Sequence, residues 1–455
     1  MDWTIAEDPV QRSLTALHRY AGAAAPDEVF LDDLQERIDA ARRRSARARP
    51  RALASGREPR VLLLGYNGAG NTGADLRAIE TVIQLRRLLA PREPRITLFA
   101  LGDCFDHPLL ASLPRLASAL PYLPDALDAA VQDADIVLNV EGSTYTSKFS
   151  DSLAGTLIGG VALAHAHGRR AIAYGVDSGA MTGTLTRFVE RNAQGGLVIA
   201  RNEAARVQLE GLGIAAQPGA DTAWTYRASS SPRIAALGPR VAALCPANPF
   251  WWPVCADAAR ARSLDARGES SPFRYGPLHF HSWDEARAAA YDAYVERFAA
   301  IAAGLRDEGY TPVLVGMEQL DLTVCRDLAA RLPFACEIVA RGPDRLDDVA
   351  AAVAHAACAV TTRYHAAVLA MSHGVPMFGL SMDTRIARLL EEADCAQWYA
   401  ACDALDGAER ALAKIGSLDE TAKREALVTA FARYADAQRV RFDEMGERLL
   451  KAIEI

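Results

Sequence analysis

The fold is decided by a stretch in which an apolar run ends in a polar turn, Ala359-Val360-Thr361-Thr362-Arg363-Tyr364-His365-Ala366-Ala367-Val368. The run 356–360 has the character of a buried parallel strand, and it stops at two threonines. Residues 366–372 then predict a helix, which ends at Gly374-Val375-Pro376. In open α/β sheets, ligands bind at such strand-to-helix turns, because backbone N–H groups and the helix dipole favour an anion there.

Arg363 and His365 lie in that turn, so their side chains are candidate functional groups. Arginine offers a planar fork of donors that suits phosphate or carboxylate. Histidine can give or take a proton near neutral pH. The pattern therefore predicts an anion site with acid–base capability, in which Arg363 and His365 are the candidate catalytic residues.

The same turn resembles the C-terminal signature of the polysaccharide pyruvyltransferase family, because Arg363-Tyr364-His365-Ala366 is followed by Gly374-Val375-Pro376. Strands and helices alternate through the chain, which predicts an α/β fold with doubly wound parallel sheets. The resemblance runs from about residue 60 to 395. It implies two Rossmann-like domains that face a cleft, in a GT-B-like arrangement.

Composition shifts predict the domain boundaries. Residues 1–58 are a helical, arginine-rich extension, which either binds an anionic surface or packs on the domain or on another subunit. Residues 59–228 form the N-terminal Rossmann-like domain, and a segment rich in Ser, Pro, Ala and Gly follows it. Residues 240–417 form the C-terminal Rossmann-like domain with the Arg-x-His turn, and residues 418–455 form a C-terminal helix.

Two strand exits in the first domain are candidate walls of the cleft. The glycine-rich turn after the strand 60–65 resembles the family's N-terminal motif, although its acidic residue, Asp75, comes one position late. The second exit keeps one glycine where the family usually has several, so the resemblance implies an altered pocket. The candidate residues are Asn67, Gly68, Asn71, Glu141, Gly142 and Ser143.

Two further arginines complete the donor site that the resemblance implies. Arg201 closes the apolar run 197–200 and precedes a helix, at a place where the family has an arginine. A salt-bridged structural arginine is the alternative. Arg385 stands in the position of the lysine in the family's Asp-x-Lys turn. The implied donor site consists of Arg201, Arg363, His365 and Arg385.

The long irregular segment 246–282 contains many aromatic residues. Such loops are usually functional or disordered, and the aromatic content argues against disorder. Because aromatic faces stack on sugar rings, Trp251, Trp252, His279 and His281 are candidates for binding an acceptor. An aromatic mini-core that covers the cleft is the alternative.

Composition restricts the class of protein. The 455 residues carry a net charge of −7, which argues against a general nucleic-acid binder. There is no apolar run of membrane-spanning length and no signal-peptide core, and the eight cysteines lack metal-ligand spacing. We therefore expect a cytoplasmic enzyme without a membrane span, a metal or a cofactor. Association into a homo-oligomer is left open.

The resemblance implies transfer of the pyruvyl carbons of phosphoenolpyruvate, the donor substrate, to hydroxyls of a sugar or glycan, with release of phosphate. The product would be a pyruvate ketal, and an enolpyruvyl ether is the other outcome. Three alternatives stay open: a GT-B glycosyltransferase that uses a nucleotide sugar, pyruvyl transfer to a small metabolite, and a non-catalytic scaffold in polymer assembly.

Overall fold

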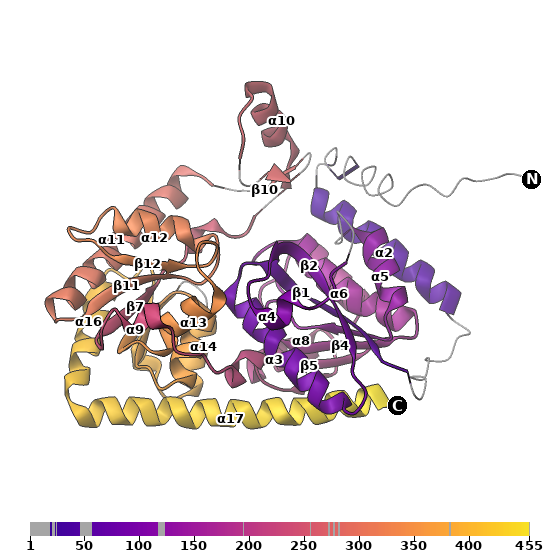
Figure 1. The fold of residues 1–455 in the computed structure, drawn as a ribbon. Coiled ribbons are helices and arrows are strands. Elements are labelled where there is room, and N and C mark those ends of the chain that lie inside the picture. Colours follow the sequence, from indigo (N-terminus) through magenta and orange to yellow (C-terminus); the bar gives the residue numbers. More distant parts are fainter. Residues whose placement is uncertain are drawn as a thin grey trace, which may run out of the picture.

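The computed structural model describes residues 19–20, 23, 25–45, 57–116, 123–193, 195–254, 256–271, 274–275, 278–280, 283–381 and 384–454. Among the predicted residues, His281 lies outside these ranges, and so does most of the extension 1–58 apart from the helix Pro26–Ser45. The described chain is α/β, with two six-stranded sheets side by side (Figure 1).

The N-terminal sheet is entirely parallel, in the order β2-β1-β3-β4-β5-β6. Its strands are β1 (Arg60–Ala69), β2 (Arg95–Cys104), β3 (Ile136–Asn139), β4 (Arg170–Val176), β5 (Leu197–Ala200) and β6 (Ala216–Pro218). Its helices are α2 (Pro26–Ser45), α3 (Thr72–Leu89), α4 (Pro108–Ala111), α5 (Pro124–Asp133), α6 (Asp151–Ala166), α7 (Gly183–Arg191), α8 (Glu203–Gly211) and the 3-10 turn η1 (Thr222–Thr225).

The C-terminal sheet is also parallel, in the order β12-β11-β7-β13-β14-β15. Its strands are β7 (Val241–Cys245), β11 (Thr311–Gly316), β12 (Glu337–Ala340), β13 (Cys358–Thr361), β14 (Met377–Ser381) and β15 (Tyr399–Ala401). Its helices are α9 (Pro232–Ala235), α11 (Glu285–Asp307), α12 (Asp321–Ala329), α13 (Leu346–Ala354), α14 (Tyr364–Ser372), α15 (Thr384–Glu392), α16 (Gly407–Gly416) and α17 (Thr421–Glu454). Short 3-10 turns are η2 (Pro249–Trp251), η3 (Ala396–Trp398) and η4 (Ser417–Asp419).

The aromatic segment predicted as a loop contains a small antiparallel sheet. Its strands are β8 (Ala256–Asp257), β9 (Arg274–Tyr275) and β10 (Leu278–Phe280), and α10 (Ala258–Arg267) accompanies them. Figure 1 shows this unit standing out from the C-terminal domain at the top of the view. The loop prediction therefore missed the local pairing, which involves strands of two or three residues.

Each large sheet has a point where the strand order reverses direction, and ligands bind at such points in α/β sheets. The reversal lies between β1 and β3 in the N-terminal sheet, and between β7 and β13 in the C-terminal sheet. The order of the C-terminal sheet, counted from its own first strand, is 3-2-1-4-5-6, which is that of dinucleotide-binding folds. The Arg363 turn follows β13 and so lies at the second reversal.

The glycine-rich segment after residue 65 differs from the predicted turn. β1 continues to Ala69 and pairs with the end of β2 through register shifts, and α3 begins at Thr72. A Cβ at Gly68, where φ is +74°, would lie 2.3 Å from the carbonyl oxygen of Gly102. Glycine is therefore required there for two strands to approach closely.

The two domains meet through the backbone as well as through side chains. The amide of Thr72 donates to the carbonyl of Met317 at 2.8 Å, and the amide of Gln319 donates to Gly70 at 3.1 Å. One continuous hydrophobic core includes residues of both sheets and of α17. α17 runs beneath both domains (Figure 1) and contacts α3, α14, β4 and β5, so it ties the halves together.

The described helix of the extension, α2, packs into the N-terminal domain. It lies against α6, where a Cβ at Gly155 or Gly159 would come within 2.2 Å or 2.4 Å of a methyl carbon of Leu31 or Leu34. Leu31 and Leu34 are almost fully buried in this contact. Glycines on α6 therefore admit the apolar face of α2, and α2 forms part of a second hydrophobic core.

Candidate functional site

A cavity of about 440 Å³ lies where the two strand-order reversals face each other. Its polar wall comes from both domains and includes Glu141, Ser143, Glu318, Arg363, His365 and Arg385. Glu141 and Ser143 follow β3, whereas Glu318 follows β11, and Arg363 and His365 follow β13. The cavity thus occupies the position at which α/β sheets bind ligands.

Several helices begin at this cavity. Five helices each place a first-turn residue in its wall: α2 (Asp27), α3 (Gly73), α6 (Leu153), α14 (His365) and α15 (Arg385). The first N–H groups of a helix have no intrahelical partner, and the helix dipole is positive at that end. The backbone therefore contributes a positive potential that favours an anionic ligand.

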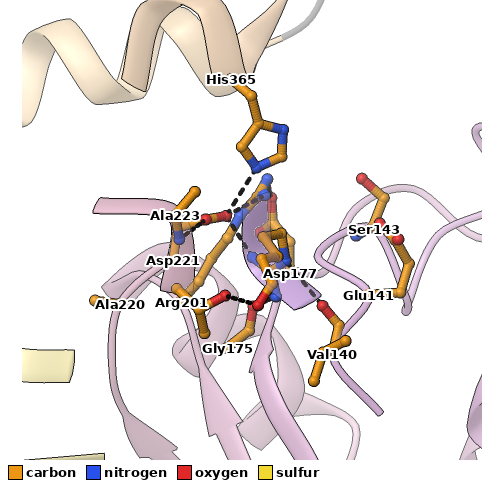
Figure 2. A network of polar contacts seen from close by, with 12 residues as sticks. Val140, Glu141, Ser143, Gly175, Asp177, Arg201, Ala220, Asp221, Ala223 and His365 are labelled. Carbon is orange, nitrogen blue, oxygen red and sulfur yellow. Dashed lines mark hydrogen bonds and ion pairs between the residues drawn. The ribbon is translucent and has the colours of Figure 1, made fainter. Parts of the chain in front are cut away.

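Asp221 lies at the centre of a buried polar network beneath the cavity (Figure 2). Its carboxylate pairs with Arg77, with Arg201 at 3.4 Å and with Nε2 of His365 at 3.4 Å, and it accepts from the amide of Ala223 at 3.0 Å. Burial acts to raise the pKa of Asp221, but Arg77, His365 and Arg201 together hold it well below its ordinary value. Asp221 is therefore a carboxylate at neutral pH.

His365 reaches that network from the other domain, since it lies on α14 whereas Asp221 follows β6 (Figure 2). Its ring rests on Gly73, where a Cβ would lie 1.9 Å from Nδ1. Burial lowers the pKa of the imidazole, and Asp221 opposes this shift without cancelling it. The side chain is 18% exposed and lines the cavity, so a neutral imidazole beside a carboxylate faces the ligand space.

Arg363 belongs to a second cluster on the C-terminal side of the cavity. Its Nε donates to Asp321 at 2.8 Å, its Nη2 contacts the other oxygen of Asp321, and Nη2 lies 2.9 Å from Glu318. Burial raises the pKa of Asp321 to about 6, and Arg363 opposes that shift. Arg363 thus lies in the cavity wall with two carboxylates against its guanidinium.

Residues 184–384 match the family model described as polysaccharide pyruvyl transferase. The resemblance to the polysaccharide pyruvyltransferase family is confirmed. The matched region includes Arg201, Asp221 and the whole turn with Arg363 and His365, so three of the four predicted donor residues and the network centre lie inside it. Arg385 follows its last residue directly. Among curated proteins, no sequence matches the chain.

Several solved structures share this fold. A Listeria monocytogenes protein assigned as a UDP-N-acetylglucosamine 2-epimerase is 13% identical, with a TM-score of 0.53 over 88% of this chain and 96% of that chain. The UDP-GlcNAc 2-epimerase from Neisseria meningitidis bound to UDP-GlcNAc is 11% identical, with a TM-score of 0.51 over 87% of this chain and 99% of that chain. Anabaena Alr3699/HepE in complex with UDP-glucose is 12% identical, with a TM-score of 0.51 over 87% of this chain and 99% of that chain.

At these identities the similarity shows the fold alone. It confirms the predicted pair of Rossmann-like domains in a GT-B-like arrangement, together with the two parallel sheets. Within the part of the chain that the structure describes, no helix is both long and apolar enough to cross a membrane. The described residues also contain no group of three or more His, Cys, Asp or Glu side chains that could hold a metal ion.

Arg201, which the family resemblance assigned to the donor site, lies beneath the cavity. Its guanidinium carbon is 4.4 Å from the ring centroid of Tyr364, and its side chain is 1% exposed. It pairs with Asp177 and Asp221. These contacts are those of a salt-bridged arginine that positions Tyr364 and Asp221 rather than of a group that meets a ligand.

Arg385 lies in the cavity wall, as a donor-site residue requires. Its Nη1 donates to Oγ of Ser143 at 3.2 Å across the two domains, and its guanidinium lies 5.8 Å from the ring centroid of Tyr364. Glu141 accepts from the amides of Tyr66 at 3.3 Å and Ser143 at 3.1 Å, which fixes the strand exit. The exit after β3 thus forms one side of the cavity.

Gly142 has a steric role in the same exit. A Cβ there would lie 2.8 Å from Nη1 of Arg201 and 3.2 Å from Nη1 of Arg77. Glycine is therefore needed for the backbone to pass over the two buried guanidinium groups.

The predicted residues of the first strand exit separate into two groups. Asn67 is 2% exposed and donates to the carbonyls of Leu63 and Phe99, so it fixes the bulge of β1. Gly68 packs against Gly102 in the same bulge. In contrast, Asn71 lines the cavity and caps α3 by accepting from the amide of Ala74 at 3.1 Å.

The predicted residues of the aromatic segment also fall into two groups, those that line the cavity and those that pack elsewhere. Trp252 lines the cavity, whereas Trp251 packs edge-on against Trp283, with 6.2 Å between ring centroids. His279 is buried in the small sheet, where its Nε2 lies 3.0 Å from Oγ of Ser271. The segment therefore covers part of the cavity and has its own aromatic packing, as expected of an aromatic mini-core, and acceptor binding by it stays a prediction.

Sequence reasoning missed the partners of the predicted residues, which are Arg77, Asp177, Asp221, Glu318, Asp321 and Tyr364. A signal existed for some of them. Asp177 follows β4 directly, and Glu318 and Asp321 follow β11, so the strand-end rule that selected Arg201 applies equally to them. For Arg77, within the helical pattern of α3, no comparable signal exists.

Proposed function

We propose that the chain transfers the pyruvyl carbons of phosphoenolpyruvate to two hydroxyls of a sugar-like acceptor, which gives a pyruvate ketal and phosphate. The observation that carries this proposal is the pair formed by His365 and the buried carboxylate of Asp221, facing a cavity at which several helices begin. The family match supports a pyruvyltransferase in general. We also propose a cytoplasmic location, since phosphoenolpyruvate is a cytoplasmic metabolite.

The donor carries a phosphate and a carboxylate, so it needs a strongly positive site. Asp27, Glu141 and Glu318 bring negative charge into the same cavity, and they offset Arg363 and Arg385. In this proposal the positive potential that the donor needs therefore comes from the helix N-termini, above all those of α14 and α15. In this proposal Arg385 and the first turn of α14 bind the donor, whereas Arg201 holds the network beneath them.

The reaction balances without a redox partner. The two acceptor oxygens form bonds to the central carbon of phosphoenolpyruvate, and the bond from that carbon to the phosphate oxygen breaks. The methylene carbon gains one proton and becomes a methyl group. The second hydroxyl proton leaves with the phosphate, so both hydroxyl protons of the acceptor are accounted for.

His365 is the group that moves these protons in the proposal. Burial keeps its imidazole neutral in the free site, so it can take a proton from an acceptor hydroxyl. A bound multiply charged anion raises the pKa of the imidazole, and Asp221 stabilises the imidazolium that forms. The imidazolium then gives its proton to the methylene carbon or to the departing phosphate.

The alternative is a nucleotide-sugar enzyme. It is favoured by one observation, the fold shared with proteins solved in complex with UDP-GlcNAc and UDP-glucose. In that case the diphosphate would occupy the first turn of α14. A titration with phosphoenolpyruvate and with UDP-GlcNAc separates the two functions.

The test is a calorimetric titration of phosphoenolpyruvate and of UDP-GlcNAc into the wild type, Arg385→Ala and Arg388→Ala. Arg388 is the matched control, because it lies one turn further along α15 than the cavity-lining Arg385. We expect phosphoenolpyruvate to bind the wild type and Arg388→Ala equally, and to bind Arg385→Ala about tenfold or more weakly, since a charge-assisted contact is lost. Binding of UDP-GlcNAc without phosphoenolpyruvate would overturn the proposal, and so would equal affinity in all three proteins.

A further inference from the structure

The cavity has an apolar end that the proposed donor chemistry does not use. Apolar residues in its wall include Tyr20, Phe30, Leu101, Phe149, Leu153 and Trp252. Tyr20 and Phe30 belong to the second hydrophobic core, and Leu101 and Leu153 pack against that core. Tyr364 and Met317, at the polar end, belong to the first core. The two ends of the cavity therefore rest on different parts of the molecule.

Internal contacts hold the apolar end in shape. The rings of Phe149 and Trp252 meet edge to face with 5.0 Å between centroids, and the amide of Val254 donates to the carbonyl of Phe149 at 3.0 Å. These contacts join the C-terminal aromatic segment to the loop before α6. Tyr20 packs edge-on against Phe30 at 5.7 Å. With Leu101 from β2, the wall thus combines four separate segments of the chain.

A carboxylate lies beside this apolar wall. Asp27 stands in the first turn of α2, lines the cavity and accepts a hydrogen bond from Oγ of Ser152. Its neighbour in the wall, Phe30, follows it on the same helix. A carboxylate with remaining lone pairs accepts hydrogen bonds from hydroxyl groups, and a sugar offers several. Asp27 can therefore fix the orientation of a hydroxylated ring whose other part is apolar.

We propose that this end of the cavity is the acceptor subsite, and that it takes a small glycoside with an apolar substituent, such as an aryl group, rather than a residue within a polysaccharide chain. The substituent lies against Phe30, Phe149 and Trp252, and Asp27 accepts from a sugar hydroxyl. The whole cavity, at about 440 Å³, lies in the range of small-molecule pockets and must also hold the donor, so the acceptor that fits beside it is small. This assignment rests on the proposed function, because it places the acceptor beside the donor.

The probes are phenyl and methyl glycosides of the same hexoses, titrated in pairs by calorimetry into the wild type, Trp252→Ala and Trp251→Ala. Trp251 is the matched control, because it is the adjacent residue and packs on Trp283 instead. For at least one hexose, we expect the phenyl glycoside to bind the wild type and Trp251→Ala at least tenfold more tightly than the methyl glycoside, since an enclosed ring buries its apolar surface. In Trp252→Ala the ratio should approach one.

Asp27→Asn tests the polar contact separately. It should weaken both members of a pair by a similar factor and leave their ratio unchanged, whereas Asp32→Asn, on the exposed face of α2, should change neither. A ratio near one for every wild-type pair would overturn the subsite. Tighter binding of an oligosaccharide than of any phenyl glycoside would overturn it as well.

Failure of the proposed function gives a different result. If phosphoenolpyruvate does not bind but the phenyl preference persists and depends on Trp252, the donor assignment is wrong and the apolar subsite stands. If phosphoenolpyruvate binds and the phenyl preference is absent, the acceptor inference alone is wrong.

Discussion

Arg201 and Arg363 follow buried strands of the two domains and precede helices, yet their surroundings differ in charge and exposure. The side chain of Arg201 is 1% exposed, and together with Arg77 it faces Asp177 and Asp221, so two cations meet two carboxylates. Arg363 is 20% exposed and meets Glu318 and Asp321, so one cation meets two carboxylates. The first cluster is balanced and closed, and the second has excess negative charge at the cavity.

The difference indicates which cluster is a scaffold and which can respond to a ligand. A closed, balanced cluster has little capacity to bind a further ion, but it fixes the groups attached to it, here His365 and Tyr364. Burial raises the pKa of Asp321 to about 6, so the unbalanced cluster can lose its excess charge by taking up a proton as the pH falls towards 6. A strand-end arginine therefore marks the edge of the sheet, while its partners decide its role.

The largest effect is expected from Asp221→Ala. This substitution leaves the buried Arg77 and Arg201 with a single carboxylate, so we expect the free energy of unfolding to fall by about 3–5 kcal/mol, as it does when one partner of a buried ion pair is removed. Urea unfolding monitored by tryptophan fluorescence measures the change. His365 also loses its partner, so phosphate release from phosphoenolpyruvate should be lost.

Glu318→Ala is the matched substitution in the other cluster. Arg363 keeps Asp321, and the excess negative charge disappears, so the loss of unfolding free energy should be about 1–2 kcal/mol. Equal losses for the two variants would show that the clusters do not differ as their charges indicate.

A smaller effect is expected from Gly73→Ala, which tests whether the closed cluster positions His365. The added Cβ would lie 1.9 Å from Nδ1 of His365, so the imidazole must move away from Asp221. Gly73 lies in the first turn of α3, where alanine fits the helical backbone. We expect phosphate release from phosphoenolpyruvate, assayed with the phenyl glycosides, to fall about 10–100-fold, because small misplacements of a catalytic group are costly.

Gly211→Ala is the control for this substitution. Gly211 is also helical, and a Cβ there meets nothing within 4 Å. The rate should stay unchanged and the stability should stay equal or rise slightly. A rate for Gly73→Ala that equals that of Gly211→Ala would mean that the contact between the ring of His365 and Gly73 has no part in catalysis.

Much of the fold could be predicted from the sequence because strand exits have a local signature. Apolar runs that end in Thr361-Thr362 or at Arg201 mark the edge of a parallel sheet, and the family match agrees with the Arg363 turn. The roles at that edge depend on partners far away in the chain. Arg201 pairs with Asp221 after another strand, and Arg363 pairs with residues after β11, so spacing along the chain could not show that both charges are already neutralised.

Steric requirements were equally invisible in the sequence. In the sequence, Gly73 and Gly142 belong to predicted turns after strands. In the structure, Gly73 leaves space for the side chain of His365, and Gly142 leaves space for that of Arg201. The apolar end of the cavity had a partial signal in Trp252, because aromatic residues in a long loop suggested a binding wall. Its other members come from the extension, from β2 and from α6 with the loop before it, which only the tertiary fold brings together.

The smallest effect concerns a third arginine at a strand end, Arg341, which follows β12 and joins the two domains. It is almost fully buried and lies 2.9 Å from Asp75 and 3.3 Å from Asp106. Burial raises the pKa of Asp75 to about 7, and the positive charge of Arg341 opposes that shift only in part. This pair therefore resembles the cluster of Arg363 more than that of Arg201, because a carboxyl group in it holds its proton more tightly in the folded state.

The sign of the pH dependence follows from that shift. Since the folded pKa of Asp75, about 7, lies above the ordinary 3.8, the folded state binds more protons than the unfolded state between these values. The contribution of Asp75 to stability is complete below pH 3.8 and is lost as the pH rises through 7. Asp321 lowers the free energy of unfolding with rising pH in the same way up to about pH 6, so the interval between pH 6 and 7 isolates Asp75 best.

In Asp75→Asn, the decline in the free energy of unfolding between pH 6 and 7 should be flatter than in the wild type. In Asp103→Asn, which changes an exposed carboxylate, this decline should be unchanged. Urea unfolding at half-unit pH steps measures both slopes. If Asp75→Asn keeps the wild-type slope, Asp75 is already ionised in the folded protein, and the pair with Arg341 belongs with the balanced cluster of Arg201.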